Sequence, residues 1–240
     1  MTPGSVLLQR GFFIMAVALI LIVRFGIRRA ALTCGDGPEA ARRLTRQFDA
    51  WAAVWFAAVI IVAASGALRR WDWRPPLFPI LAAVMLALGV AFARSTLGDR
   101  LARGLPLAWL VAFQGFRLPL ELLMHRAYTE GVMPVQMSYS GRNFDIVTGI
   151  TALLLGAAMS IWRVPKTLVW IWNVMGLILL INIVSVAVAS LPLFRAFGPD
   201  RLNTFVTYPP YVFLPAVMVL AAWAGHLVVF KALVSSKFKS

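Results

Sequence analysis

Cysteine is almost absent from this chain: Cys34 is the only one among 240 residues. A single cysteine excludes an intramolecular disulfide, a CxxC redox pair, a thiolate cluster and a CxxCH haem attachment. Histidine is nearly as rare, with only His125 and His226. The GxSxG, HExxH and P-loop patterns are also missing from the sequence. Only a small set of polar side chains is therefore left to carry an activity.

Charge is scarce as well. Charged residues make up 13% of the chain and hydrophobic residues 61%, with a mean hydropathy of +0.82. A soluble domain has about 25% charged and about 45–50% apolar residues. A chain of this length has too little interior to bury so many apolar side chains. The composition predicts an integral membrane protein, with residues 1–240 forming a single domain.

The charge that is present is mostly positive: 23 Lys and Arg against 9 Asp and Glu, a net charge of +14. These cations lie mainly between apolar runs and at the C-terminus, where they set topology and meet anionic headgroups. No stretch combines aromatic and basic residues as a nucleic-acid surface does. The expected partner is a lipid bilayer with anionic inner-leaflet lipids, and nucleic acid is not expected.

Long apolar runs dominate the chain, and a helix needs about 20 such residues to cross a bilayer. The first run follows Arg10 and is not followed by a small-residue cleavage site, so we expect an uncleaved span. The sequence predicts an all-α polytopic membrane helix bundle. Its seven expected spans are roughly 6–27, 50–68, 76–93, 105–125, 144–162, 167–191 and 209–230.

The distribution of cations predicts the orientation. One side holds fourteen of them: Arg24, Arg28, Arg29, Arg42, Arg43, Arg46, Arg94, Arg100, Arg103, Arg163, Lys166, Lys231, Lys237 and Lys239. The other side holds eight: Arg10, Arg69, Arg70, Arg74, Arg126, Arg142, Arg195 and Arg201. We expect the N-terminus outside and the C-terminus in the cytoplasm, in a bacterial inner membrane. The basic segment 28–49 is expected to be partly helical, with a helix start signal at Asp36 and Pro38, and to lie on the inner leaflet as a surface helix.

The fourth predicted span carries the clearest polar pattern. Gln114, Arg117, Glu121 and His125 are spaced 3, 4 and 4 residues apart and so lie on one stripe of a helix. Pro119 is expected to kink this helix. We expect Arg117 and Glu121 to form an ion pair facing the interior of the bundle. Charges within a membrane usually mark a functional site, although a pair that only fixes helix packing is the alternative.

The loop before the fifth span, "SGRNFD", supplies further polar groups. We expect Arg142, Asn143 and Asp145 to meet the outer end of the polar stripe. Asp145 could accept from His125 or Arg142, and Asn143 could bridge. Asp145 could also serve only as a helix cap, because an acid near a helix N-terminus complements the dipole.

The sixth span carries two amides on opposite sides. We expect Asn182 to lie within reach of Glu121. Asn173 is expected to lie nearer the cytoplasmic end, where a hydrogen bond to His226 would tie the sixth span to the seventh.

Two membrane cofactors are not expected. A haem held by two histidines needs them at matching depth, whereas His125 and His226 are predicted near opposite leaflets. Retinal needs a lysine in the middle of a span, and every lysine lies at or beyond a span end. A metal site remains possible at Glu121, His125 and Asp145, although one histidine makes a poor zinc site.

The second half of the chain resembles a family of bacterial multi-pass membrane proteins that are uncharacterised. The resemblance lies in "FRLPLELLMH", "MPVQMSYSGRNFDIVTGI", "WNVMGLILLINIV", "YPPYVFLP" and "GHLVVFKAL", and covers roughly residues 113–233. It supports the segment boundaries and the focus on the fourth span and its loop. It implies no activity.

Three functions are compatible with these features. The polar site favours binding or transport of a small or amphiphilic ligand, or of protons. A membrane-embedded hydrolase of lipid-like substrates is the first alternative, with a metal or with Glu121 or His125 as a general base. The second alternative is a structural subunit of a larger membrane complex.

Overall fold

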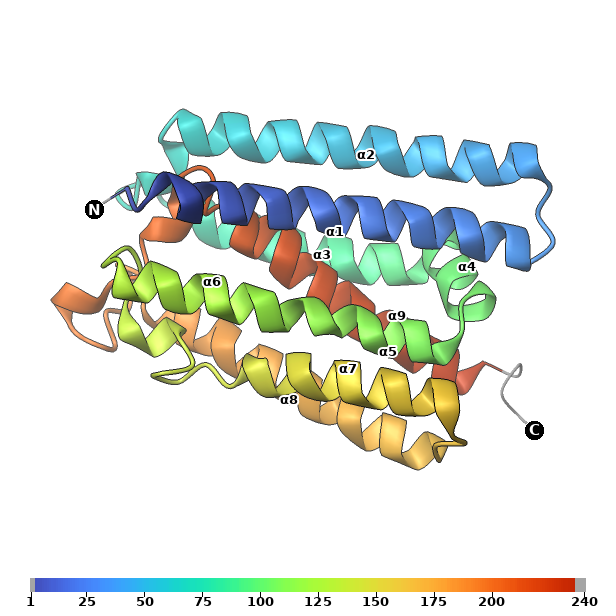
Figure 1. Cartoon of the computed structure of the whole chain (residues 1–240). Coiled ribbons are helices and arrows are strands. Elements are labelled where there is room, and N and C mark those ends of the chain that lie inside the picture. The colour runs from blue at the N-terminus through green and yellow to red at the C-terminus, as the bar shows by residue number, and fades with distance from the viewer. Residues whose placement is uncertain (1–2, 236–240) are drawn as a thin grey trace.

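A computed structural model describes residues 3–235, and within them every regular element is a helix (Figure 1). The long helices run roughly side by side along one direction. We call the two ends of this bundle the N-terminal end and the C-terminal end, after the chain terminus that lies at each. The helices are α1 (Val6–Thr33), α2 (Pro38–Ala64), α3 (Leu77–Arg94), α4 (Thr96–Gly104), α5 (Leu107–Phe113), α6 (Arg117–Thr129), α7 (Asp145–Ile161), α8 (Lys166–Ala189) and α9 (Leu220–Val234).

The predicted polytopic membrane helix bundle is confirmed over the described residues. Six helical segments are long and apolar enough to cross a membrane: Val6–Thr33, Pro38–Ala64, Leu77–Arg94, Leu107–Thr129, Lys166–Ala189 and Leu214–Val234. The apolar helix α7 has 17 residues and runs alongside the others (Figure 1). That length is the lower limit for a span, about 17 residues. Seven crossings and their orientation stay predictions.

Residues 28–49 are largely helical and the helix start predicted at Pro38 is confirmed, but the segment does not form a separate surface helix. Most of this segment continues the neighbouring long helices, since α1 runs to Thr33 and α2 begins at Pro38. Helix-favouring residues fill both stretches, and the only break is the short turn around Gly35, which has a φ of +87°. An Arg24–Asp49 ion pair of 2.9 Å holds the two helices together.

A short helix, α4, occupies a connection where no element was predicted. The Ser95 hydroxyl caps it by accepting from the backbone N–H of Gly98 at 3.4 Å. Two ion pairs fix α4 at the C-terminal end of the bundle. Arg100 pairs with Asp36 at 2.6 Å, and Asp99 pairs with Lys231 of α9.

Small residues let α7 pack closely against α5 and α6. A Cβ atom on Gly149 would lie 2.4 Å from the backbone nitrogen of Leu118. On Gly156 it would lie 2.8 Å from the Cβ of Ala112. Glycines at helix contacts allow the backbones to approach, as is common in membranes. This contact sets the start of α7 against the first turns of α6.

Two prolines interrupt the regular helices. Pro119 lies near the start of α6, and Gln114–Phe116 before it forms a 3₁₀ turn, so the irregularity expected there is present. Pro215 lies in a π-helical turn, Leu214–Val219, which precedes α9. In this turn the Ala216 carbonyl accepts from Trp55 Nε1 at 2.9 Å.

A carboxylate at the N-terminal end holds the start of α1 to the end of α6. Glu130 accepts from the Ser5 backbone N–H at 2.6 Å and from the Ser5 hydroxyl at 2.8 Å. Arg126 Nε donates to it at 2.7 Å. These bonds, from Arg126 first and then from Ser5, lower the pKa of Glu130 from 4.5 to about 2.

This clamp predicts a pH-dependent stability. A depressed folded-state pKa gives stability that is complete above the ordinary pKa of 4.5 and is lost as the pH falls toward about 2. Glu130→Gln is therefore expected to lower the thermal stability in detergent by a constant amount above about pH 5, and by progressively less below it. Glu39→Gln, an exposed carboxylate on α2, is the matched control. Wild type and Glu130→Gln differing equally at all pH values would contradict the clamp.

Candidate buried polar site

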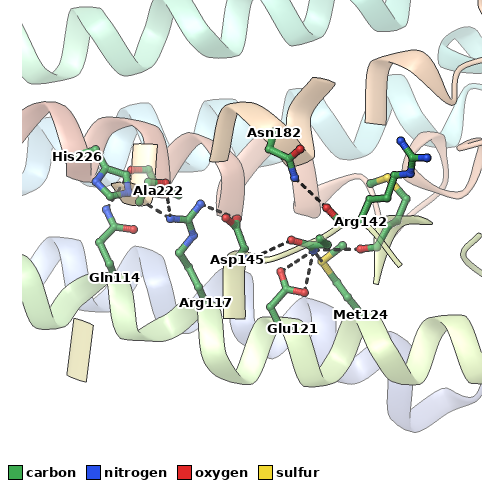
Figure 2. Close-up of polar contacts among 12 residues, drawn as sticks. Gln114, Arg117, Glu121, Met124, Arg142, Asp145, Asn182, Ala222 and His226 are labelled. Carbon is green, nitrogen blue, oxygen red and sulfur yellow. Dashed lines mark hydrogen bonds and ion pairs between the residues drawn. The ribbon is translucent and has the colours of Figure 1, made fainter. Parts of the chain in front are cut away.

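Arg117 is the centre of a polar cluster inside the bundle (Figure 2). Its side chain is 1% exposed, and its Nη2 donates to Asp145 Oδ2 at 2.5 Å. The expected ion pair with Glu121 is therefore wrong. The close contact of α7 with α6 places Asp145, the first residue of α7, beside the guanidinium. The side chain of Asp145 therefore binds Arg117 and makes no capping hydrogen bond, while its position in the first turn of α7 also complements the helix dipole.

The other side of the guanidinium faces α8 and α9. Arg117 Nη1 lies 3.3 Å from the carbonyl oxygen of Gly176 and 3.1 Å from His226 Nε2. A guanidinium can only donate, so His226 Nε2 must accept and Nδ1 must carry the ring proton. His226 is thus a neutral imidazole in this arrangement.

The predicted hydrogen bond between Asn173 and His226 is confirmed. His226 Nδ1 donates to Asn173 Oδ1 at 2.8 Å, and Asn173 Nδ2 donates to the His226 carbonyl at 3.2 Å. This pair also joins the polar stripe, because the long Arg117 side chain reaches His226. Gly176 makes room for the ring: a Cβ there would lie 2.6 Å from His226 Cε1.

Glu121 lies one helical turn beyond Arg117 and has a different partner. Its side chain is 2% exposed, and both carboxylate oxygens lie 2.8 Å from Asn143 Nδ2. Asn143 also donates to the Met137 carbonyl at 3.0 Å and accepts from the Asp145 backbone N–H at 3.1 Å. Asn143 therefore bridges the loop, Glu121 and the start of α7, as the sequence suggested.

His125 contacts the loop, and the described hydrogen bonds include none between His125 and Asp145. Its Nδ1 lies 3.0 Å from the Ser138 hydroxyl and 3.3 Å from the Ser140 hydroxyl. Its ring stacks on Tyr139, with centroids 4.4 Å apart. His125 is only half-buried, so it lies between the outside of the N-terminal end and the buried Glu121.

Three further residues of the predicted site contribute in other ways. Asn182 donates to the backbone carbonyl of Arg142 at 2.8 Å and so holds the loop, and no Asn182–Glu121 bond is seen among the described contacts (Figure 2). The Arg142 guanidinium lies over the Phe197 ring, 5.1 Å from its centroid, and points away from the cluster. Gln114 donates to the Ala222 carbonyl at 3.0 Å beside Gly225.

The cluster has more negative than positive groups. Within its described members, one guanidinium faces two carboxylates, Glu121 and Asp145, and all three are almost completely buried. Ionised together they would leave one uncompensated negative charge inside the bundle, which is expensive. Asp145 Oδ1, Thr148 Oγ1 and Gln114 Oε1 also lack a hydrogen-bond partner among the described residues. Buried polar atoms are normally satisfied, so these three are notable.

The three candidate metal ligands named from the sequence, Glu121, His125 and Asp145, do not come together among the described residues. Over residues 3–235, no three His, Cys, Asp or Glu side chains gather closely enough to hold a metal ion. Glu121, His125 and Asp145 each turn to a different partner: Asn143, the loop serines and Arg117.

Sequence reasoning missed two members of this site, His226 and Thr148. Thr148 lies three residues after Asp145, so helical spacing could have placed it on the same face. For His226 the sequence carried no signal that it would meet Arg117, because that contact depends on how α9 packs against α6 and α8.

Comparison with known proteins identifies a family but no activity. The model of a family described as "Domain of unknown function (DUF8737)" matches residues 74–234, about two thirds of the chain. This range contains every residue of the cluster. No curated protein and no solved structure matches the chain.

The pairing of Arg117 with Asp145 predicts a specific pattern of stabilities. Arg117→Met or Asp145→Asn alone leaves the other group buried without its partner and should cost about 3–5 kcal/mol. The double variant should cost clearly less than the sum of the two. Glu121→Gln is the matched comparison on the same helix and should be tolerated much better. Thermal unfolding in mild detergent measures all four variants. Additive losses, or coupling of Arg117 with Glu121 instead, would contradict the pair.

Proposed function

The chain belongs to the DUF8737 family, a domain of unknown function, and we propose that it is a membrane protein that binds or transports protons through its buried polar site. Glu121 is the group that takes up and releases the proton. Arg117 stays paired with Asp145 and bound to the neutral His226 ring while Glu121 gains or loses its proton. The proposal follows the general rule that ionisable groups within a membrane bundle serve proton or ion pathways.

One observation carries this proposal: two buried carboxylates share a single buried cation. Arg117 contacts Asp145 directly, whereas the described hydrogen bonds to Glu121 come only from the Asn143 amide. An ionised Glu121 would be a buried charge without a cation beside it. A proton on Glu121 neutralises the cluster without breaking the Arg117–Asp145 pair.

The proton also fits the space better than a larger ligand does. The cluster is filled by its own side chains, and Gly149, Gly176 and Gly225 leave no room even for an added Cβ. Two cavities of about 360 and 440 Å³ lie at the C-terminal end of the bundle, away from this site. A proton needs no cavity.

Polar side chains lie between Glu121 and the N-terminal end of the bundle. His125 lies one turn from Glu121 on the same face of α6, and residues at i and i+4 are neighbours on a helix. Its Nδ1 contacts the Ser138 and Ser140 hydroxyls of the loop. An imidazole can accept a proton on one ring nitrogen and donate one from the other, so His125 can pass protons between the outside and Glu121.

The setting is proposed to be a bacterial inner membrane with the N-terminal end outside, as the distribution of cations predicts.

The second candidate function is the binding of a small ligand that donates hydrogen bonds. It is favoured by the acceptors Asp145 Oδ1 and Thr148 Oγ1, one turn apart on α7 and without a described partner. Such a ligand would appear in a mass-spectrometric inventory of the protein purified in mild detergent.

The state of Glu121 can be tested by infrared spectroscopy. The wild-type protein near neutral pH is expected to show the C=O band of a protonated, buried carboxylic acid. Glu121→Gln should remove this band, whereas Glu130→Gln, a carboxylate at the surface of the same end, should keep it. A wild-type spectrum without the band, or a band that persists in Glu121→Gln, would show that Glu121 does not hold the proton.

Reconstitution into vesicles with a trapped pH dye separates transport from binding. If the protein transports protons, Glu121→Gln should slow the proton flux about tenfold or more.

His125 is expected to control access and not stability. His125→Ala removes a half-buried ring at the end of α6, so the free energy of unfolding should change by about 0.5 kcal/mol or less. The response of the Glu121 band to a pH jump on the N-terminal side should slow several-fold. Thr129→Ala, on the next turn of the same helix, is the control. An unchanged response in His125→Ala would place the proton route elsewhere.

A further inference from the structure

A second site lies at the opposite end of the bundle, between α1 and the junction of α4 with α5. There a cavity of about 360 Å³, open on one side, is lined by Arg29, Thr33, Arg103, Gly104, Leu105, Pro106 and Trp109. Figure 1 shows α4 beside the end of α1 at this end of the bundle. We call this cavity the basic pocket.

Close backbone packing forms the closed side of the basic pocket. A Cβ on Gly104 would lie 2.3 Å from the Ala30 carbonyl oxygen, so α4 ends directly against α1. The side chains of Leu101 and Leu105 cover Gly26 one turn earlier on α1. Arg29 and Arg103 extend from the two helices that meet here, and both line the pocket.

The lining of the basic pocket suits an anion. It contains two guanidinium groups, and none of its described residues is acidic. The Thr33 hydroxyl donates to the Arg29 carbonyl at 3.0 Å. Each guanidinium carries five N–H donors, so an arginine can bind an anion while it keeps another contact. Arginine is the preferred side chain for phosphate because its planar fork donates two parallel hydrogen bonds.

Three acidic residues at this end of the bundle are engaged with other cations. Asp49 pairs with Arg24, and Asp36 pairs with Arg100. Asp99 pairs with Lys231. None of these three ion pairs involves Arg29.

Apolar surface adjoins the basic pocket. Trp109, which lines it, is 47% exposed, and Phe25, one turn before Arg29 on α1, is 61% exposed. An indole with one face in an apolar region and its N–H near polar groups is typical of the membrane interface. A cationic pocket next to an exposed apolar strip matches a ligand with a charged head and hydrocarbon chains.

We infer that the basic pocket binds the phosphate headgroup of an anionic membrane lipid. Arg29 and Arg103 hold the phosphate, Trp109 lies beside the glycerol region, and the acyl chains run along the apolar surface that includes Phe25. The positive-inside count predicts that this end of the bundle lies at the anionic leaflet. The inference does not depend on the proposed proton site, which lies toward the other end.

Lipid titration of the purified full-length protein tests this assignment. Native mass spectrometry in mild detergent measures how much phosphatidylglycerol or phosphatidylcholine the protein retains. We expect clear preference for phosphatidylglycerol, weakened about fivefold by Arg29→Gln and by Arg103→Gln individually. Arg28→Gln, which removes the same charge at the neighbouring exposed position outside the pocket, should keep wild-type binding. Thermal unfolding without added lipid confirms that each variant is folded.

The source of the phosphate is tested separately. Inorganic phosphate and glycerol phosphate in large excess should fail to displace the lipid, because they lack the acyl chains. Brominated phosphatidylglycerol should quench the tryptophan fluorescence, and Trp109→Phe should reduce the quenched fraction. Equal loss of binding in Arg28→Gln and Arg29→Gln would show a diffuse surface charge and overturn the site. Displacement by inorganic phosphate would make it a site for a free anion, and quenching unaltered by Trp109→Phe would place the lipid elsewhere.

Discussion

The arrangement of the second half of this protein depends on one buried guanidinium. Arginine stays charged under all ordinary conditions, so Arg117 cannot escape the cost of burial by losing its proton. It must be surrounded by acceptors, and they come from three other helices: the Asp145 carboxylate from α7, the Gly176 carbonyl from α8 and the His226 ring from α9. Satisfying this one side chain fixes how α6, α7, α8 and α9 lie relative to one another.

Glycines make that arrangement possible. Gly149 lets the backbone of α7 approach α6 near Arg117, and Gly176 leaves space for the His226 ring. Gly225, next to His226 in sequence, leaves space for the Gln114 amide. Each lies where a polar side chain or a neighbouring backbone fills the volume that a Cβ would need. The polar cluster and the close helix contacts are therefore parts of the same packing solution, typical of membrane interiors.

Composition and periodicity were sufficient for the class of fold and for part of the candidate site. Apolar runs of membrane-crossing length predicted the long helices, and spacings of 3 and 4 predicted that Gln114, Arg117, Glu121 and His125 share a face. The partner of Arg117 could not be obtained in this way. Glu121 at i+4 and Asp145 across the helix interface were both chemically suitable, and the register between α6 and α7 decides between them.

The ends of the helices were harder to predict, because an apolar run marks the part of a helix that can lie inside a membrane and not the full length of the helix. Residues 28–33 and 38–49 are polar enough to fall outside the predicted spans, yet their helix propensity continues α1 and α2 without a break. The same reasoning missed α4, whose signal was a capping serine in a short charged connection. Helix propensity did predict the start at Pro38, and the capping serine, read separately from hydropathy, would have found α4.

The family match separates the two proposed sites. Residues 74–234 include the whole polar cluster, from Gln114 to His226, and the outer residue His125. The basic pocket instead combines Arg103 and Trp109 from that range with Arg29 and Thr33 of α1, which precede it. Whatever the buried cluster does is therefore contained in the part of the chain that defines the family. Lipid binding depends in addition on how α1 packs against α4, through the Ala30–Gly104 contact. A chain with the same buried cluster and a different first helix would therefore keep the function of the cluster and lose lipid binding at the basic pocket.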